Sequence, residues 1–199
     1  MMQLYLIRHT RPDVPEGLCY GRHDVALHED DFAARLPLIA AHLPAGLALH
    51  CSPASRCTRL AQALVSRGGG SLAQPDARLH EMHFGDWEAR LWRDLPREET
   101  LRWTGDIVGE TPPGGENFME MWARVAAFRE EVIRPATQKM EALGIVGHAG
   151  SLKVLIMQAL KLPPLQYGAF DLAQGHVSRI DVRVDAAGAL AEKLVFLNR

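Results

Sequence analysis

The sequence LYLIRHTRP at residues 4–12, close to the start of the chain, carries the clearest signal of the fold class. Its first part, Leu4 to Ile7, is a short continuous apolar run, which is typical of a strand buried on both faces of a parallel sheet. Similar runs occur at residues 47–50 and 144–147, and each is followed by polar residues or glycine and then by a helical pattern. This repeated order of strand, loop and helix predicts an α/β fold.

Apolar residues that recur at three- and four-residue intervals predict four helices. Their expected ranges are residues 30–43, 52–68 with a cap at Ser52 or Ser55, 116–133, and 151–160. The glycines at 68–70 end the second helix, and Pro135 favours a kink or a boundary near the far end of the third. Alternation at 178–184 and the apolar residues 194–197 predict two closing strands joined by a turn at Ala187-Gly188.

The composition indicates an ordinary globular protein. The chain has 199 residues, of which 47% are hydrophobic, and its formal net charge is −2. We therefore expect a single domain over residues 1–199, and neither disorder nor a general attraction to nucleic acid. Residues 81–115 are rich in Trp, Arg, Gly and Pro, so we interpret them as an insertion that shapes the substrate site.

The cysteines and the hydropathy pattern predict a cytoplasmic location. Cys19, Cys51 and Cys57 are odd in number and form no CxxC pair, which favours reduced thiols. The apolar run at residues 4–7 is too short for a signal peptide, and no other segment is long enough to cross a bilayer. We therefore expect no membrane partner.

Charged side chains follow the ends of the first two predicted strands. Arg8, His9 and Arg11 come directly after the first strand, at the edge of the sheet where α/β proteins bind ligands. Arg56 lies in the first turn of a helix that follows the second strand, where free backbone N–H groups attract anions. An arginine beside an imidazole suits phosphoryl chemistry, because arginine binds two oxygens while neutral histidine attacks phosphorus. The alternative for each is a solvated surface charge.

Glu81 and His148 complete the candidate site. Glu81 lies among apolar residues and His80 and His83; since desolvation raises the pKa of a carboxyl group, it is a candidate proton donor. His80 and His83 are an alternative zinc pair, but the HExxH spacing and a clear third ligand are missing, so no metal is expected. His148 follows the strand at 144–147 and is either a second imidazole facing the same anion or a core or capping histidine.

Taken in order, these motifs resemble the histidine phosphatase superfamily, in its phosphoglycerate-mutase-like branch. The resemblance implies a three-layer α/β/α sandwich with a mostly parallel central sheet and a small phosphomonoester as substrate. It implies that His9 is the catalytic nucleophile that becomes phosphohistidine and that Glu81 protonates the leaving alcohol. Arg8, Arg56 and His148 would bind the phosphate oxygens. The resemblance also implies that the reaction needs no cofactor and no metal.

Within the superfamily, residues 8–14 and 17–22 resemble the alpha-ribazole phosphatase subgroup, which acts in cobalamin biosynthesis. The resemblance places Gly21 beside the phosphate, with its backbone N–H able to approach it. Tyr20, Arg22 and Arg11 are candidate substrate-binding residues. Arg22 could equally be solvated, and Arg11 could instead pair with Asp13 or Glu16. The tryptophans of the insertion either stack on a base-like group or pack together.

Three other functions stay open at this point. They are a phosphatase of sugar phosphates or other small phosphomonoesters, a phosphoglycerate-mutase-type phosphotransferase, and a catalytically silent module that binds phosphorylated ligands. The 199-residue length favours a phosphatase over a mutase, and the presence of both His9 and Glu81 disfavours the silent module. The oligomeric state is left open, with a homodimer as one alternative.

Overall fold

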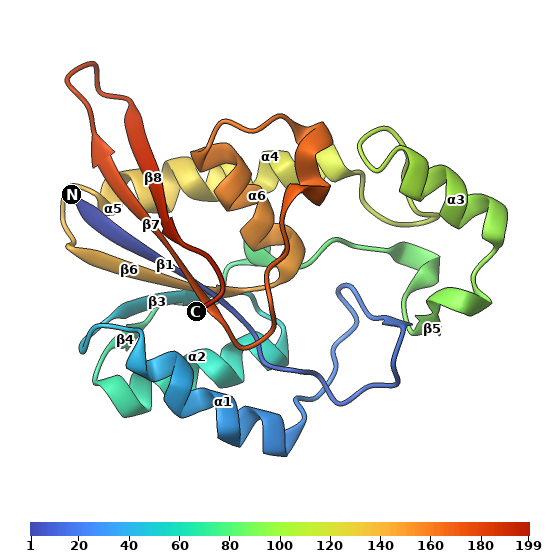
Figure 1. The fold of residues 1–199 in the computed structure, drawn as a ribbon, viewed down its shortest axis with the longest axis horizontal. Helices are drawn as coiled ribbons and strands as arrows, with labels where there is room; N and C mark the ends of the chain where they lie inside the picture. The colour runs from blue at the N-terminus through green and yellow to red at the C-terminus, as the bar shows by residue number, and fades with distance from the viewer.

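A computed structural model describes residues 1–199. A six-stranded sheet with the order β4-β3-β6-β1-β7-β8 forms its centre (Figure 1). The strands are β1 (Met2–Arg8), β3 (Ala48–Cys51), β4 (Ser71–Leu72), β6 (Ala142–Gly147), β7 (Val177–Val184) and β8 (Leu190–Phe196). The neighbouring strands β4, β3, β6 and β1 are parallel to one another. β7 is antiparallel to β1, and β8 is antiparallel to β7. The predicted mostly parallel sheet is therefore confirmed.

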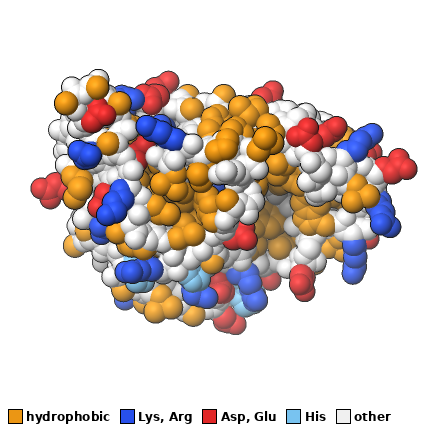
Figure 2. Space-filling model, turned by 45° about the horizontal axis from the view of Figure 1, so that its top comes forward, with side chains coloured by type: hydrophobic (Ala, Val, Ile, Leu, Met, Phe, Trp, Pro, Cys, Tyr) orange, Lys and Arg blue, Asp and Glu red, His pale blue; other side chains and the backbone are white.

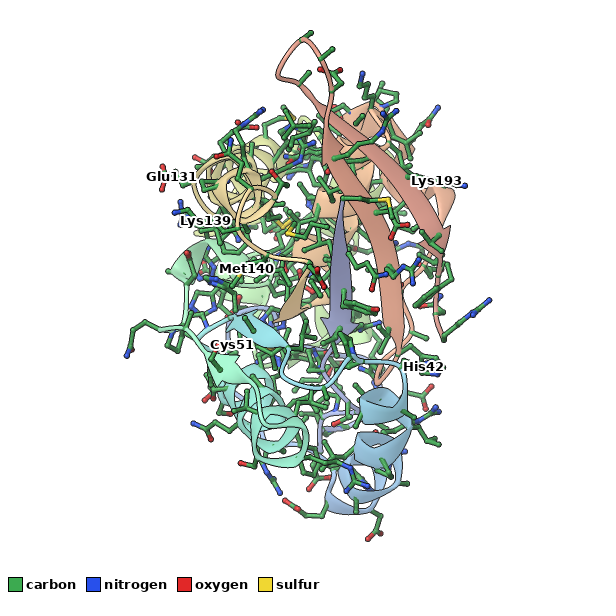
Figure 3. The ribbon with its side chains drawn as sticks, turned by 90° about the vertical axis from the view of Figure 1, so that its left-hand side faces the viewer. His42, Cys51, Glu131, Lys139, Met140 and Lys193 are labelled. Atoms are coloured by element: carbon green, nitrogen blue, oxygen red, sulfur yellow. The ribbon has the colours of Figure 1, made fainter.

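Helices cover both faces of the sheet, which gives three layers (Figures 1 and 3). One face packs on α1 (Glu29–Ala41) and α2 (Ser55–Gly68). The other face packs on α4 (Phe118–Phe128), the π-helical turn η4 (Arg129–Ile133), α5 (Arg134–Ala136) and α6 (Ala149–Ala159). Side chains of β1 alternate between the layers: Leu4 and Leu6 join the core under α4 and α6, while Tyr5 and Ile7 join the core under α1 and α2. The continuous apolar run is thus explained by burial on both faces.

The insertion is a separate lobe at one end of the sheet (Figure 1). It contains the 3-10 turns η2 (Gly85–Trp87) and η3 (Trp92–Asp94), the strand β5 (Arg90–Leu91) and the helix α3 (Arg97–Gly105). β5 pairs with β2 (Leu18–Cys19) in a small sheet. Two further 3-10 turns lie outside the lobe, η1 (Ala77–Leu79) and η5 (Pro164–Ala169).

Most element boundaries agree with the sequence to within a few residues. The third helix, expected to begin near Glu116, begins two residues later at Phe118, because Asn117 caps α4 in a capping box with Glu120. The expected serine cap of α2 is wrong, since Ala54 occupies the N-cap position without a side-chain bond. The boundary expected near Pro135 is present, because the helical segment continues from α4 through the π-helical turn η4 and ends with α5 at Ala136.

The hairpin and the helix end that were predicted from glycines are confirmed. Gly69 adopts a left-handed conformation at the end of α2, and Gly188 does so in the turn between β7 and β8. None of the helices combines the length and the apolar character that crossing a bilayer requires.

Candidate active site

The register of the sheet brings three strand ends together. β1 pairs with β6 so that Arg8 lies opposite Gly147, and therefore His9 and His148 leave adjacent parallel strands side by side. β3 pairs with the other edge of β6, with Cys51 opposite Val146, which places Ser52 next in the row. The backbone N–H of His9 donates to Gly147 O over 3.1 Å, so pairing continues up to the site itself.

His9 is buried, with 1% of its surface exposed. Its Nδ1 lies 2.8 Å from the carbonyl oxygen of Thr10. A carbonyl only accepts hydrogen bonds, so Nδ1 carries the proton and Nε2 has a free lone pair. Burial, with the positive charges of Arg56 and Arg8, lowers the pKa of His9 from 6.5 to about 3. The imidazole is therefore neutral at pH 7, with a lone pair on Nε2.

Two guanidinium groups flank this imidazole. Arg56 is 1% exposed, and it donates from Nη2 to Gly21 O over 2.7 Å and from Nη1 to His23 O over 3.1 Å. Arg8 donates from Nη1 to Leu172 O. The Nε atoms of both arginines are buried without a hydrogen-bond partner in the protein. The sequence-based alternative of a solvated surface arginine is therefore wrong for Arg56, and the site combines two fixed positive charges with free donors.

His148 is fully buried, and its ring centroid lies 5.2 Å from that of His9. Ser52 Oγ lies 2.8 Å from His148 Nε2 and orients the ring. Burial, with the neighbouring His9 and Arg56, holds the pKa of His148 well below its usual value. In the free protein His148 is therefore a neutral hydrogen-bonding group, and the positive charge of the site comes from the arginines.

Glu81 lies in a loop and reaches the first turn of α6. The N–H of Gly150 donates to both of its carboxyl oxygens, over 3.0 and 3.1 Å, and the N–H of Met82 donates to Oε1 over 2.9 Å. The sequence predicted apolar and imidazole neighbours for Glu81, but it did not predict that backbone N–H groups, including that of Gly150 at the start of α6, bind its carboxyl group. A Cβ atom at position 150 would overlap Glu81 Oε1, so glycine lets this carboxyl group approach the start of the helix.

The loop of residues 20–22 lies against the turn that follows Glu81. Gly21 has a positive φ of 41°, and an added Cβ would collide with the side chain of Glu88. Glu88 Oε1 accepts the backbone N–H groups of Arg22 and Phe84, each over 2.9 Å. The ring of Tyr20 lies 6.4 Å from that of His9, centroid to centroid. Glycine is thus needed at position 21 because the side chain of Glu88 packs closely against its backbone. Tyr20 lies at the border of the site.

The remaining charged candidates lie further from the imidazoles or have other partners. Arg11 is exposed and forms no ion pair with Asp13 or Glu16; its backbone N–H donates to Asp31. Arg22 bonds within the protein, from Nη2 to Glu116 over 2.8 Å. No three His, Cys, Asp or Glu side chains converge as metal ligands anywhere in the chain.

The aromatic side chains of the insertion form both a small core and a wall of the site. Trp87 is buried and donates from Nε1 to Glu99 over 3.1 Å. Trp92 and Trp103 stack with their ring planes 23° apart, and Phe84 packs edge-on against both. A cleft of about 160 Å³ is lined by residues of this cluster and of the site: Leu18, Cys19, Tyr20, Gly21, Glu81, Phe84 and Trp92. Figure 2 shows a hollow between the insertion lobe and the body of the molecule, with hydrophobic side chains along its walls.

Sequence reasoning did not find several residues that hold this site in place. Ser52 was interpreted as a helix cap, yet it orients His148. The contact of Gly150 with Glu81 was not predicted, and neither Arg124 nor Glu116 was assigned a role in the site. The hydrogen bonds of Arg124 and Glu116 to the Glu81 loop join segments more than 30 residues apart, so local patterns carry no signal for them.

Comparisons with known proteins agree with this arrangement. The family model of the histidine phosphatase superfamily (branch 1) matches residues 4–191. The adenosylcobalamin/alpha-ribazole phosphatase of Salmonella typhimurium is 33% identical over 187 residues, covering 91% of each chain. The crystal structure of the alpha-ribazole phosphatase from Shigella flexneri has a TM-score of 0.85 at 29% identity, covering 100% of this chain and 96% of that one. A mycobacterial glucosyl-3-phosphoglycerate phosphatase has the same TM-score at 22% identity, over 100% of this chain and 99% of its own, which shows a shared fold.

Proposed function

The chain belongs to the histidine phosphatase superfamily, and on that premise we propose that it removes the phosphate of alpha-ribazole 5′-phosphate through a phosphohistidine intermediate. It is a phosphomonoesterase. The substrate is proposed because relatives with 29–33% identity over 91% of the chain bear the name of alpha-ribazole phosphatases. A role in cobalamin biosynthesis, a cytoplasmic location and a single functional domain are parts of the same proposal.

The observation that carries the mechanism is the state of His9. Its Nδ1–H is bound by Thr10 O, so Nε2 presents a lone pair, and its low pKa keeps the ring unprotonated. A lowered pKa also lowers nucleophilicity. Burial lowers the pKa of His9 most, and the charges of Arg56 and Arg8 lower it further; a phosphate dianion bound between the two arginines offsets the part that comes from their charges.

The proposed reaction has two displacements at phosphorus. His9 Nε2 forms a bond to phosphorus while the P–O bond to the alcohol breaks, and Glu81 gives its proton to the leaving oxygen. Water then attacks the phosphohistidine, returns a proton to Glu81, and releases inorganic phosphate and free His9. Arg8, Arg56, His148 and the Gly21 N–H bind the phosphate oxygens throughout, so that charge is stabilised by groups already in place. No metal ion or cofactor takes part in these steps.

We propose that the leaving group occupies the cleft beside Glu81. Its walls include Tyr20, Phe84 and Trp92, and such flat aromatic surfaces suit the planar base of alpha-ribazole. Arg11 and Arg22 are proposed contacts for polar parts of the substrate. A sugar phosphate, which is the main alternative substrate class, has no planar base to stack in this cleft.

The test is a substrate panel measured with EDTA present. We expect kcat/KM for alpha-ribazole 5′-phosphate to exceed the values for sugar phosphates, 3-phosphoglycerate and p-nitrophenyl phosphate by well over tenfold. His9→Ala should abolish turnover and the acid-labile phosphoryl adduct, whereas His42→Ala, an exposed histidine at the end of α1, should leave both unchanged. Figure 3 labels His42 on the outside of the molecule.

Each other outcome refutes a defined part of the proposal. Comparable turnover of many phosphomonoesters that still requires His9 would refute the substrate. Transfer of phosphate to a second phosphoglycerate would indicate a mutase, and phosphate binding without turnover would indicate a silent module. Activity lost on EDTA treatment would refute metal independence.

A further inference from the structure

The loop that carries Glu81 is held by side chains rather than by secondary structure. Glu81 lies between the 3-10 turns η1 and η2, outside both sheets. Arg124, which projects from α4, donates from Nη1 to the carbonyl oxygens of Arg78 over 2.6 Å and His80 over 2.8 Å. Its Nη2 donates to the carbonyl oxygen of Glu81 over 3.1 Å. One guanidinium group therefore binds three backbone carbonyls of this loop.

Glu116 orients that guanidinium group. Its Oε1 accepts from Arg124 Nη2 over 2.6 Å, and its Oε2 accepts from Arg124 Nε over 3.0 Å. With the three carbonyls, these oxygens give five contacts for the five N–H donors of an arginine. Burial acts to raise the pKa of Glu116, but its hydrogen bonds to Arg124 and the charges of Arg124 and Arg22 outweigh it and hold the pKa below its usual value. The pair is therefore ionised and bidentate.

The same pair reaches both sides of the Glu81 loop. Glu116 Oε1 accepts the N–H of His83 over 3.0 Å, and the N–H of Glu116 donates to His83 O over 2.9 Å. Arg22, from the loop beside the phosphate site, donates from Nη2 to Glu116 and from Nε to Glu81 O over 3.3 Å. The main chain of Glu81 is thus held by a partly buried network of three charged side chains.

We propose that Arg124 and Glu116 are positioning residues for the proton donor: they fix the main chain of Glu81 so that its carboxyl group meets the N–H of Gly150 and faces the leaving group. This inference rests on the proposed role of Glu81. The hydrogen bonds of Arg124 and Glu116 go to the Glu81 loop and to Arg22, and none goes to the imidazole of His9 or His148. Without the guanidinium group, the carbonyl oxygens of Arg78 and His80 lose their side-chain donor, and Glu81 O keeps only the longer bond from Arg22. The loop must then rearrange to find other donors.

The test compares two leaving groups in Arg124→Gln. An alkyl phosphate needs protonation of its leaving oxygen, whereas p-nitrophenyl phosphate needs little. Because a displacement of about 1 Å costs about 10²-fold in rate, we expect kcat on the alkyl phosphate to fall about 10- to 100-fold. On p-nitrophenyl phosphate it should fall less than about threefold, with inhibition by vanadate unchanged. Arg124→Lys, which keeps the charge but not the planar fork, should recover only part of the loss.

Arg129→Gln is the matched control. Arg129 continues the same helical segment and forms an ion pair with Glu192 in which the side chains are 17% and 3% exposed, close to the 16% and 11% of Arg124 and Glu116. It has no contact with the Glu81 loop. Even if Arg129→Gln lowers the melting temperature as much as Arg124→Gln does, we expect it to leave the ratio of kcat on the alkyl phosphate to kcat on p-nitrophenyl phosphate unchanged.

Glu116→Gln keeps the shape of the side chain and tests the same inference if Arg124→Gln does not fold. It should show the same selective loss on the alkyl phosphate, and Glu81→Gln combined with either variant should be no slower than Glu81→Gln alone. If Glu81→Gln slows both substrates equally, the role of Glu81 as proton donor fails. If Glu81→Gln is selective but folded Arg124→Gln and Glu116→Gln are not, the positioning inference alone is overturned.

Discussion

Replacing Gly150 by alanine should impair catalysis while leaving the fold intact. Gly150 lies in the first turn of α6, and its N–H donates to both carboxyl oxygens of Glu81. An added Cβ would overlap Glu81 Oε1 and approach Met121 Sδ to 3.3 Å. The carboxyl group must therefore move away, whereas the helix itself gains, because alanine is favoured over glycine in a helix by about 1 kcal/mol.

The size of the effect follows from the overlap. Relief of the overlap requires a shift of about 1 Å in the carboxyl oxygen, and misplacement of a catalytic group by that distance costs about 10²-fold in rate. We therefore expect kcat on an alkyl phosphate to fall about 10²-fold, within the range that general acid catalysis contributes. The melting temperature should change by only a few degrees, since the lost hydrogen bonds and the gain in helix propensity oppose each other.

The assay measures kcat on an alkyl phosphate and on p-nitrophenyl phosphate, together with thermal unfolding. Gly68→Ala is the control, because Gly68 ends α2 in an ordinary conformation with open space around the added Cβ. This variant should keep the wild-type rate on both substrates. Wild-type turnover of the alkyl phosphate by folded Gly150→Ala would refute the argument that this contact sets the position of Glu81.

Two further predictions concern the phosphate side of the site. Arg56→Lys keeps the positive charge but loses the planar fork that can bond Gly21 O, His23 O and two phosphate oxygens together, so kcat should fall about 10²-fold; an unchanged kcat would place Arg56 outside the site. Burial and the charges of Arg56 and Arg8 lower the pKa of His9 from 6.5 to about 3, so between these values the unfolded chain binds a proton that the folded chain does not. The free energy of unfolding should therefore decrease as the pH falls from 6.5 toward 3, and His9→Asn should flatten this decrease in phosphate-free buffer. Parallel pH profiles of melting temperature for both proteins would contradict the lowered pKa.

Much of the fold could be predicted because its signals are local. The apolar runs of β1 and β6 are buried on both faces, and a run of that kind has few other interpretations. The glycines at the end of α2 and in the last hairpin are needed for positive φ angles, so they mark the same boundaries in the sequence and in the structure. The start of α4 was less predictable, since Glu116 extends the helical pattern but binds the Glu81 loop instead.

By itself, the sequence determined the α/β class, the histidine phosphatase motifs and the residues proposed for phosphoryl transfer. Strand ends in a parallel sheet meet at one edge, so the positions of His9, Arg56 and His148 followed from where their strands stop. The environment of Glu81 could not be predicted in this way, because it depends on tertiary contacts with Gly150, Arg124 and Glu116. These contacts join segments that are far apart in the chain, and their energy depends on which carbonyl or carboxyl oxygen each donor reaches. That geometry arises only when the sheet, α4 and α6 have packed together.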